Sequence, residues 1–507
     1  MDSSRPVSQK VTVVGPMSQF ATFAVECPMT KTIGKPYNRP QIPGTNEKKE
    51  SDYMGNPIKD TVQNFAVTQA LNYLDNNPKE VFPKLLDWAD QFDKDNLYLS
   101  QRKQFRKVME DPTNNWNRLI NSLWTDIDPQ VRKVFFRNFI VNASLMGSRK
   151  QIANREKYDC NIPWAILMDP TSACNLHCTG CWAAEYGNRL NLTYEELDDI
   201  INQANELGTY MFLYTGGEPM VRKNDLIRLC EAHPDCVFSA FTNGTLIDEA
   251  FADEMLRVKN FYPAISIEGF EEATDFRRGE GTYQATMRAM KILKEKKLPF
   301  GVSGCYTSMN IDSISSEDFF DHLVECGAKF AWFFHYMPVG NDAAVELLPT
   351  PEQREKMYDR IREYRSTKPI FTIDFQNDAK FTNGCIAGGR NYLHINANGD
   401  IEPCAFIHYS DSNIREKTLL EAYQSPLFMA YHDNQPFNEN MFQPCPMLEN
   451  PECLRSMVKS SGAHSTEYQS PESVDHLCDK TTPYAENWKP KADELWAACQ
   501  GCNGCKK

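Results

Sequence analysis

Residues 168–187, MDPTSACNLHCTGCWAAEYG, contain three cysteines in a CxxxCxxC spacing, at Cys174, Cys178 and Cys181. The apolar segment WAILM, residues 164–168, leads directly into them and is typical of a buried strand. Short apolar segments then alternate with amphipathic helical patterns as far as the helix that follows Pro351. This alternation predicts an α/β fold whose parallel sheet curves into a partial barrel, with the chemistry in loops at the carboxyl ends of the strands.

The cysteine loop therefore lies at the expected catalytic rim of the barrel. Cysteine thiolates bind iron-sulfur clusters, and a 4Fe-4S cluster with only three protein ligands keeps one iron open for another ligand. A structural zinc site is the alternative, because tetrahedral Zn²⁺ also accepts cysteines at short spacings. The spacing by itself leaves both kinds of site open.

The stretch CNLHCTGC resembles the cysteine loop of the radical S-adenosylmethionine (SAM) superfamily, whose members carry it after the first strand of a partial (βα)6 barrel. The resemblance implies a 4Fe-4S cluster whose open iron is chelated by the amino and carboxylate groups of SAM. Reductive cleavage of SAM would release a 5′-deoxyadenosyl radical. This chain departs from the usual pattern at Gly180, where the family has an aromatic residue, and has Trp182 after the third cysteine.

A TGGEP segment after the second predicted strand contains the next candidates, Gly216, Gly217, Glu218 and Pro219. Two glycines let a backbone approach a ligand closely, and a carboxylate accepts hydrogen bonds from an ammonium group. In the family that the chain resembles, this element binds the methionine amino group of SAM. As an isolated motif GGEP is a common turn.

Four polar residues near the same rim are further candidates for SAM binding: Asn243, Ser266, Glu268 and Arg278. They follow the third and fourth predicted strands, in FTNGT, SIEG and TDFRRGEGTYQ, and the family often has an SxDG-like element where this chain has Glu268. Capping of strand ends and turns is the alternative role for the first three. Arg278 would otherwise be an ordinary surface charge.

The chain is rich in cysteine after residue 380. From Cys385 to Cys404 the order is cysteine, thirteen residues, Gly399, four residues and cysteine, and NYLHINANGDIEPC predicts a β-hairpin with a type I′ turn at Asn398-Gly399. This order resembles the opening of the SPASM domain, which implies auxiliary 4Fe-4S clusters. Eight cysteines, enough for two fully ligated clusters, are the candidate ligands: Cys385, Cys404, Cys445, Cys453, Cys478, Cys499, Cys502 and Cys505.

The division of these ligands is open, because Cys445 and Cys453 stand apart from the compact CQGCNGC at residues 499–505. His464 or His476 could complete a site, and the terminal CxxCxxC could be a zinc knuckle or a redox tail. The other six cysteines are expected to be small buried side chains: Cys27, Cys160, Cys230, Cys236, Cys305 and Cys326.

Four parts of the chain are expected. Residues 1–60 form an irregular arm rich in Pro, Gly and charge, and residues 61–158 form a helical N-terminal domain with apolar residues at three- and four-residue intervals. Residues 159–368 form the partial barrel, and residues 369–507 form a SPASM-like auxiliary iron-sulfur domain. The N-terminal domain has no functional signature.

The composition limits the partners and the compartment. A formal net charge of −14 predicts no general attraction to nucleic acid. The sequence has neither the run of about 18 apolar residues that a transmembrane helix needs nor a signal peptide, so the cytoplasm is expected. Seventeen cysteines in a reducing compartment indicate metal binding or catalysis.

We expect an enzyme that cleaves SAM and abstracts a hydrogen atom from its substrate, with a reductant such as flavodoxin or ferredoxin. A peptide or protein is the first expected substrate, by analogy with other SPASM-bearing enzymes. A lipid or small molecule is the second, including coupling of alkyl chains, since FAWFFHYMPVG at residues 330–340 could line an apolar channel. A non-catalytic iron-sulfur protein that carries electrons or senses oxygen is the alternative from another class.

Overall fold

The computed structural model describes residues 86–87, 90 and 99–501. The predicted arm at residues 1–60 and the terminal cysteines Cys502 and Cys505 lie outside this part of the chain. No described helix combines the length and the apolar character that crossing a bilayer requires.

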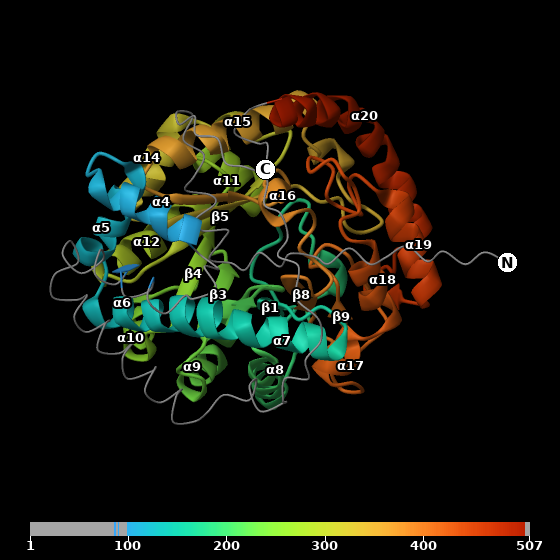
Figure 1. The fold of residues 1–507 in the computed structure, drawn as a ribbon, viewed down its shortest axis with the longest axis horizontal. Helices are drawn as coiled ribbons and strands as arrows, with labels where there is room; N and C mark the ends of the chain where they lie inside the picture. The colour runs from blue at the N-terminus through green and yellow to red at the C-terminus, as the bar shows by residue number, and fades with distance from the viewer. Residues whose placement is uncertain (1–85, 88–89, 91–98, 502–507) are drawn as a thin grey trace, which may run out of the picture.

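A nine-stranded sheet forms the centre of the molecule, in the order β7-β6-β5-β4-β3-β2-β1-β8-β9 (Figure 1). Every neighbouring pair from β7 to β8 is parallel, and β9 runs antiparallel to β8. The strands are β1 (Ala165–Met168), β2 (Met211–Tyr214), β3 (Val237–Thr242), β4 (Phe261–Ser266), β5 (Gly301–Tyr306), β6 (Phe330–His335), β7 (Phe371–Asp374), β8 (Tyr392–Ile395) and β9 (Ile401–Glu402).

Helices follow the strands and cover the outer face of the curved sheet. The largest apolar core lies between them, since it joins residues of the strands to residues on the buried faces of these helices. The helices are α8 (Tyr194–Leu207), α9 (Lys223–Ala232), α10 (Glu249–Val258), α11 (Glu271–Arg278), α12 (Thr282–Glu295), α13 (Ile311–Ile314), α14 (Glu317–Cys326) and α15 (Pro351–Thr367). The predicted α/β fold with a partial barrel is confirmed.

The sheet also takes in strands from beyond residue 368. Strand β7 extends it past β6, and β8 pairs with β1 in parallel register, Ala165 opposite Tyr392 and Met168 opposite Ile395. Strand β1 is therefore flanked by β2 on one side and by a strand of the cysteine-rich region on the other. The domain boundary at residues 368 and 369 remains a prediction, and the sheet runs across it.

The predicted hairpin is present as β8 and β9, with His394 opposite Glu402. The predicted type I′ turn is wrong, because that turn needs positive φ at both central residues and Gly399, at +85°, has it whereas Asn398 does not. The Asn396 carbonyl accepts from the Gly399 amide at 2.9 Å, and the Asn396 side chain accepts from the Asp400 amide at 3.0 Å. These bonds hold a longer turn that needs only Gly399 in the left-handed region.

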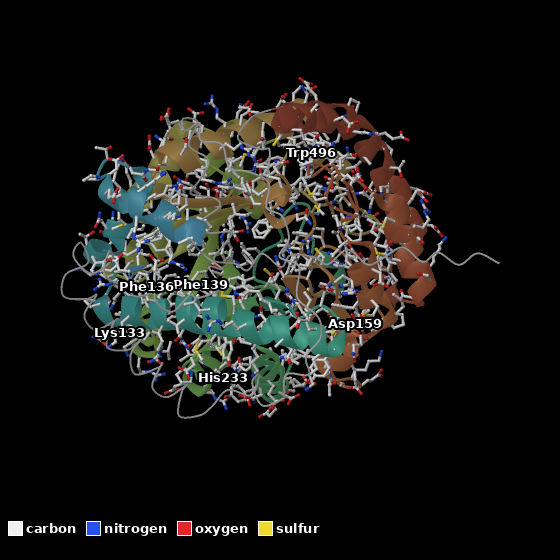
Figure 2. All side chains as sticks on the ribbon, in the orientation of Figure 1. Lys133, Phe136, Phe139, Asp159, His233 and Trp496 are labelled. Atoms are coloured by element: carbon white, nitrogen blue, oxygen red, sulfur yellow. The ribbon has the colours of Figure 1, made fainter. Side chains whose placement is uncertain are left out.

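The described part of the N-terminal domain is helical, as predicted. It comprises α4 (Leu99–Glu110), α5 (Asn115–Asp126), α6 (Pro129–Phe135), a π-helix η2 (Phe136–Gly147) and α7 (Ser148–Tyr158). The last three form one long helix that crosses the view in Figure 1, from Lys133 to its end at Asp159 (Figure 2). It packs on the N-terminal side of the strands, where Asn138 donates to the Cys236 carbonyl and Trp164 to that of Ala143.

A second apolar core lies under α18 (Pro426–Asn434), α19 (Pro451–Ser461) and α20 (Val474–Gly501). The other C-terminal helices are α16 (Ala379–Thr382) and α17 (Leu419–Tyr423), and α17 packs on the first core. Helix α20 passes from α19 towards α15 (Figure 1). Arg354 of α15 is fully buried there, 2.7 Å from Glu449 and 4.1 Å from the ring centre of Trp488. This pair connects the barrel helix α15 to the C-terminal region.

Replacing Arg354 with Met will lower the free energy of unfolding by about 3–5 kcal/mol, because Glu449 then stays buried without its cation. Thermal unfolding followed by circular dichroism measures the loss. The matched control on the same helix is Lys356→Met, whose pair with Asp312 is exposed, and it will cost about 0–1 kcal/mol. Equal losses in the two variants would contradict the assigned role of Arg354.

Candidate active site

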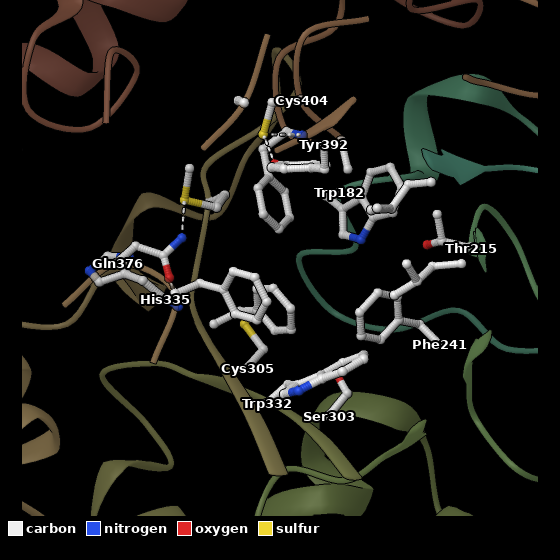
Figure 3. A pocket seen from close by; sticks show the side chains of 18 of the residues that line it. Trp182, Thr215, Phe241, Ser303, Cys305, Trp332, His335, Gln376, Tyr392 and Cys404 are labelled. Carbon is white, nitrogen blue, oxygen red and sulfur yellow. Dashed lines mark hydrogen bonds between the residues drawn. The ribbon is translucent and has the colours of Figure 1, made fainter. Parts of the chain in front are cut away.

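A cavity of about 370 Å³ lies inside the curved sheet and beneath its C-terminal rim (Figure 3). The three cysteines of the CxxxCxxC loop line it, and so do three cysteines of the C-terminal region. The two groups are Cys174, Cys178 and Cys181, and Cys385, Cys404 and Cys445. Cysteines that are some 200 residues apart in sequence therefore border one space.

The strands reach this cavity through alternate residues, as the two-residue period of a strand requires. The last inward residue is small on β4 and β5, whereas it is aliphatic or aromatic on the other strands. The lining residues include Ala165 and Leu167 of β1, Met211 and Leu213 of β2, Phe241 of β3, Ser266 of β4, Ser303 and Cys305 of β5, Trp332 and Phe334 of β6, and Phe371 and Ile373 of β7.

The loop cysteines are free thiols, and Cys174 is exposed while Cys178 and Cys181 are half-buried. Burial raises the pKa of the Cys174 thiol to about 11, so a bound cation is needed to keep it as a thiolate at neutral pH. The Thr179 amide donates to the Arg277 carbonyl at 2.8 Å and ties the loop to α11. The donor set fits an iron-sulfur cluster, since three free thiols on one loop face a shared cavity.

A site for a single metal ion would need several ligands that converge on one point, unlike the site for a cluster. Within residues 86–87, 90 and 99–501, no group of three or more His, Cys, Asp or Glu side chains is placed to hold one metal ion. A cluster takes each thiolate on a different iron atom, so its ligands do not have to converge on one point.

The GGEP glycines pack the backbone of this element directly on the cysteine loop. A Cβ on Gly217 would lie 2.2 Å from the Ala173 carbonyl oxygen, and Gly216 has φ +99° with its Cβ position 2.6 Å from the Thr171 carbonyl oxygen. The Gly217 amide donates to the Thr171 carbonyl at 3.0 Å, and the Glu218 amide donates to the Ala173 carbonyl at 2.8 Å. Only glycine allows this approach, so the element also positions the cysteines.

Glu218 lines the cavity, but three groups of the protein already donate to its carboxylate. They are the Met220 amide at 2.9 Å, the Thr242 hydroxyl at 2.6 Å and the Asn243 amide at 2.8 Å. A carboxylate has about four acceptor positions, which leaves one for a ligand. Pro219 is buried at the start of η4 (Pro219–Arg222) and is not among the lining residues.

Asn243, Ser266 and Arg278 line the cavity, whereas Glu268 is fully buried behind it. Glu268 accepts from Arg277 at 2.7 Å and from Arg278 at 2.5 Å, and the attraction of both arginines lowers its pKa against the effect of burial. Arg278 is not a surface charge, because Glu268 holds its guanidinium in the wall, 4.0 Å from the Cys178 sulfur. Two arginines against one glutamate leave net positive charge beside the loop cysteines.

The C-terminal cysteines differ in their surroundings. Burial raises the pKa of the Tyr431 hydroxyl, and four cysteines close to it raise it further: Cys385, Cys404, Cys445 and Cys453. Cys453 is not among the lining residues. Cys478 is fully buried and donates to the Pro451 carbonyl at 3.1 Å, and Cys499 is half-buried near the end of α20. His476 pairs with Glu472, and His464 is exposed in β11 (His464–Ser465).

Comparison with known families agrees with this arrangement. Residues 168–326 match the model of the Radical SAM superfamily, and residues 385–453 match that of SPASM, an iron-sulfur cluster-binding domain. The chain contains a radical SAM domain followed by a SPASM domain. It is therefore a radical SAM enzyme that uses a 4Fe-4S cluster and SAM, and its SPASM domain adds auxiliary iron-sulfur clusters.

Two curated relatives have different named activities. An AdoMet-dependent heme synthase of Methanosarcina barkeri is 24% identical over 294 residues, which are 52% of this chain and 83% of the relative. A PqqA peptide cyclase of Granulibacter bethesdensis is 25% identical over 292 residues, which are 53% of this chain and 76% of the relative. Both similarities cover about half of the radical SAM chain.

Among solved structures, Streptococcus suis SuiB bound to precursor peptide SuiA has a TM-score of 0.50 to this chain and is 20% identical. The match covers 68% of this chain and 81% of SuiB. At this identity the similarity shows the fold alone.

A buried ionic contact joins the radical SAM barrel to the SPASM hairpin. His394 of β8 lies 2.9 Å from Asp169, which follows β1, and 2.6 Å from Glu402 of β9. All three side chains are fully buried, and Tyr186 donates to Glu402 at 2.8 Å. Burial opposes charge on His394, but the two carboxylates outweigh it and raise its pKa to about 10. The imidazolium holds the base of the cysteine loop against the hairpin.

Sequence reasoning missed several residues of this site. Cys305, expected to be a core thiol, lines the cavity (Figure 3). Arg277 shares Glu268 with Arg278, although the segment TDFRRGEGTYQ had drawn attention only to the second arginine. For Cys305 the available signal was its place two residues from Ser303, on the same face at the end of a strand.

We expect Gly217→Ala to slow formation of 5′-deoxyadenosine from SAM by about 10²-fold, because its new Cβ displaces the Ala173 carbonyl and with it the cysteine loop. Quantification of 5′-deoxyadenosine after anaerobic reduction measures the effect. Gly462→Ala serves as the control for backbone strain alone, since Gly462 has φ +70° and nothing lies within 4 Å of its Cβ position. Unchanged activity in Gly217→Ala would show that this backbone approach is dispensable.

The stabilising effect of His394 will depend on pH. Its folded pKa of about 10 lies above the ordinary value of 6.5, so its contribution is complete below about pH 6.5 and is lost as the pH rises through about 10. His394→Gln will therefore have a lower melting temperature than wild type at pH 7, by an amount equivalent to a few kcal/mol, and the gap will narrow towards pH 10. A constant gap would mean that His394 is neutral in the fold.

Proposed function

We propose that Cys174, Cys178 and Cys181 hold the SAM-binding cluster and that the enzyme abstracts a hydrogen atom from a substrate in the cavity beneath them. The observation that supports this most directly is that one cavity borders these cysteines, the GGEP glycines and three SPASM cysteines. When bound, the cluster and SAM supply a 5′-deoxyadenosyl radical. A hydrogen donor must therefore lie within the same enclosed space.

The protein's own groups bind and orient SAM in this proposal. The backbone of Gly216 and Gly217 and the remaining acceptor position of Glu218 receive the ammonium group of methionine. Arg278, fixed by Glu268, attracts the carboxylate. Asn243, whose amide donates to Glu218, and Ser266 at the end of β4 are further polar groups in the cavity wall. Pro219 and Glu268, which we first expected to bind SAM, act by shaping the GGEP turn and by holding the arginines.

For the auxiliary clusters we propose that Cys385, Cys404, Cys445 and Cys453 hold the first. All four lie close to Tyr431, and the Tyr392 hydroxyl is 2.7 Å from the Cys404 sulfur. Cys478 and Cys499 stand at opposite ends of helix α20, roughly 30 Å apart along the helix, so one cluster cannot take both. Cys499, Cys502 and Cys505 are then the candidate ligands for a second site. The first cluster borders the cavity, which suits it to accept an electron from the substrate or to bind the substrate.

The lining of the cavity favours an apolar substrate group. Most of its inward side chains are aliphatic or aromatic, whereas each backbone amide of a peptide needs a hydrogen-bond partner when it is buried. Trp332 and Phe334, from the segment that suggested an apolar channel, are both in the wall. We therefore place a lipid or other apolar molecule first. A peptide that inserts one apolar side chain is second, supported by the name of the Granulibacter relative and by the peptide bound to SuiB.

The enzyme needs a low-potential electron donor to reduce the SAM-binding cluster, and a flavodoxin or ferredoxin in the cytoplasm suits this role. Either electron donor, the flavodoxin or the ferredoxin, would have to bind to an enzyme whose formal net charge is −14.

Anaerobic reconstitution tests the assignment with two cysteine variants. Wild-type enzyme reduced with dithionite will convert SAM to 5′-deoxyadenosine, and Cys178→Ala will not, while it keeps its auxiliary iron. Cys404→Ala will lose roughly four iron atoms per chain yet still cleave SAM. Cys326→Ala is the control, because this half-buried thiol is outside the cavity wall. Cleavage of SAM by Cys178→Ala would disprove the proposal.

A further inference from the structure

The cavity extends along the barrel instead of ending under the cysteine loop. On β1 and β2 it is lined from the first residues of the strands, Ala165 and Met211, up to Thr215 and the GGEP glycines. On β7 it is lined from Phe371 to Phe375 beyond the strand end. At about 3.3 Å per residue, strands of four to six residues span about 13–20 Å. Its far end is at Trp164 and at Phe139 of η2.

Polarity changes along this length. Small polar side chains gather at the cluster end, namely Thr215, Asn243, Ser266 and Ser303. Leu167 and Leu213 lie further from the rim, and the far end has Ala165, Met211, Phe371 and Phe139. An occupant that runs the whole length would thus have its polar or reacting part at the cluster end and hydrocarbon elsewhere.

Three polar side chains along the seam between β7 and β8 are already paired within the protein. Asp378 accepts from Arg365 and from the Asp374 amide, Gln376 accepts from the His335 amide at 2.9 Å, and Thr382 donates to the Ala379 and Gly384 carbonyls. These side chains already form hydrogen bonds within the protein. Little in the seam is free to pair with the amides of a buried peptide.

Aromatic rings make one side of the cavity rigid. Phe241 contacts Trp332 and Phe334 with ring centres 5.4 and 5.6 Å apart, and Phe334 stacks on Phe375 at 4.4 Å (Figure 3). Trp332, Phe334 and Phe375 all line the cavity, so these rings present one apolar face to the passage along the strands. An extended hydrocarbon chain in this passage contacts several rings at once.

We propose that this cavity binds one unbranched hydrocarbon chain, such as a fatty acyl chain, lying along the barrel axis from the cysteine loop to Phe139 and Trp164. The inference rests on the proposed function and adds the substrate class to it. The length of the passage then selects chain length, because a chain that reaches the far end can gain no further apolar contact.

Equilibrium dialysis of the anaerobic holoenzyme with ¹⁴C-labelled fatty acids of 8 to 18 carbons tests this proposal. Affinity will rise about three- to fourfold for each added methylene and then level off once the chain fills the passage. Single-chain lysophosphatidylcholine, used in parallel, distinguishes a phospholipid source of the chain from a free fatty acid. Binding of iron protoporphyrin IX, with no binding of any acyl chain, would overturn the proposal.

Two variants narrow the passage at different depths. If one of them fails to fold, the other still tests the proposal. Leu213→Trp fills its middle, and Ala165→Met fills its far end. Both will move the levelling point to shorter chains, Leu213→Trp further than Ala165→Met. Ile152→Trp on the exposed side of α7 is the control and will leave the chain-length profile unchanged. Identical profiles in the wild type and both cavity variants would refute the passage.

The same samples separate this inference from the proposed function. If SAM is cleaved to 5′-deoxyadenosine but no chain length is selected, the hydrocarbon assignment fails and the radical SAM site stands. If acyl chains bind with the expected profile but SAM is not cleaved, the site assignment fails instead.

Discussion

The architecture depends on the parallel pairing of β1 with two neighbours, β2 and β8. Since parallel strands end at the same edge of a sheet, this pairing brings together the ends of three segments that are distant in sequence. The cysteine loop follows β1, GGEP follows β2, and the hairpin that precedes Cys404 begins with β8. Without β8 beside β1, the SPASM cysteines would have no fixed position relative to the SAM-binding loop.

Two buried charge contacts stabilise this arrangement where the barrel meets the C-terminal region. His394 links Asp169 at the end of β1 to Glu402 of the hairpin, and Arg354 links α15 to Glu449 beside Cys445. Both cations are removed from water, where an unpaired charge would be costly. Each contact therefore favours the observed placement of the C-terminal region on the barrel over placements in which a buried charge has no partner.

The cavity combines two chemical environments because the inward positions hold different residue types near the rim and deeper in the barrel. At the rim the arginines, Glu218 and small polar groups surround the cysteines, and deeper in the barrel the aromatic wall excludes water. Exclusion of water protects a reactive intermediate from side reactions. Most side chains that line the described cavity are aliphatic or aromatic, and this composition is the basis of our proposal that hydrocarbon occupies it.

The sequence by itself determined the α/β class, the cysteine loop, the GGEP element and the hairpin, since each depends on short-range spacing or a two-residue period. Only the tertiary structure decided that Cys305 and Arg277 face the cavity, that Glu268 lies behind it and that β8 joins β1. Those outcomes depend on contacts between distant segments, such as His394 with Asp169, and local patterns in one sequence carry no record of which segments pair. The turn at Gly399 differed from expectation for a related reason, because bonds from Asn396 selected its geometry.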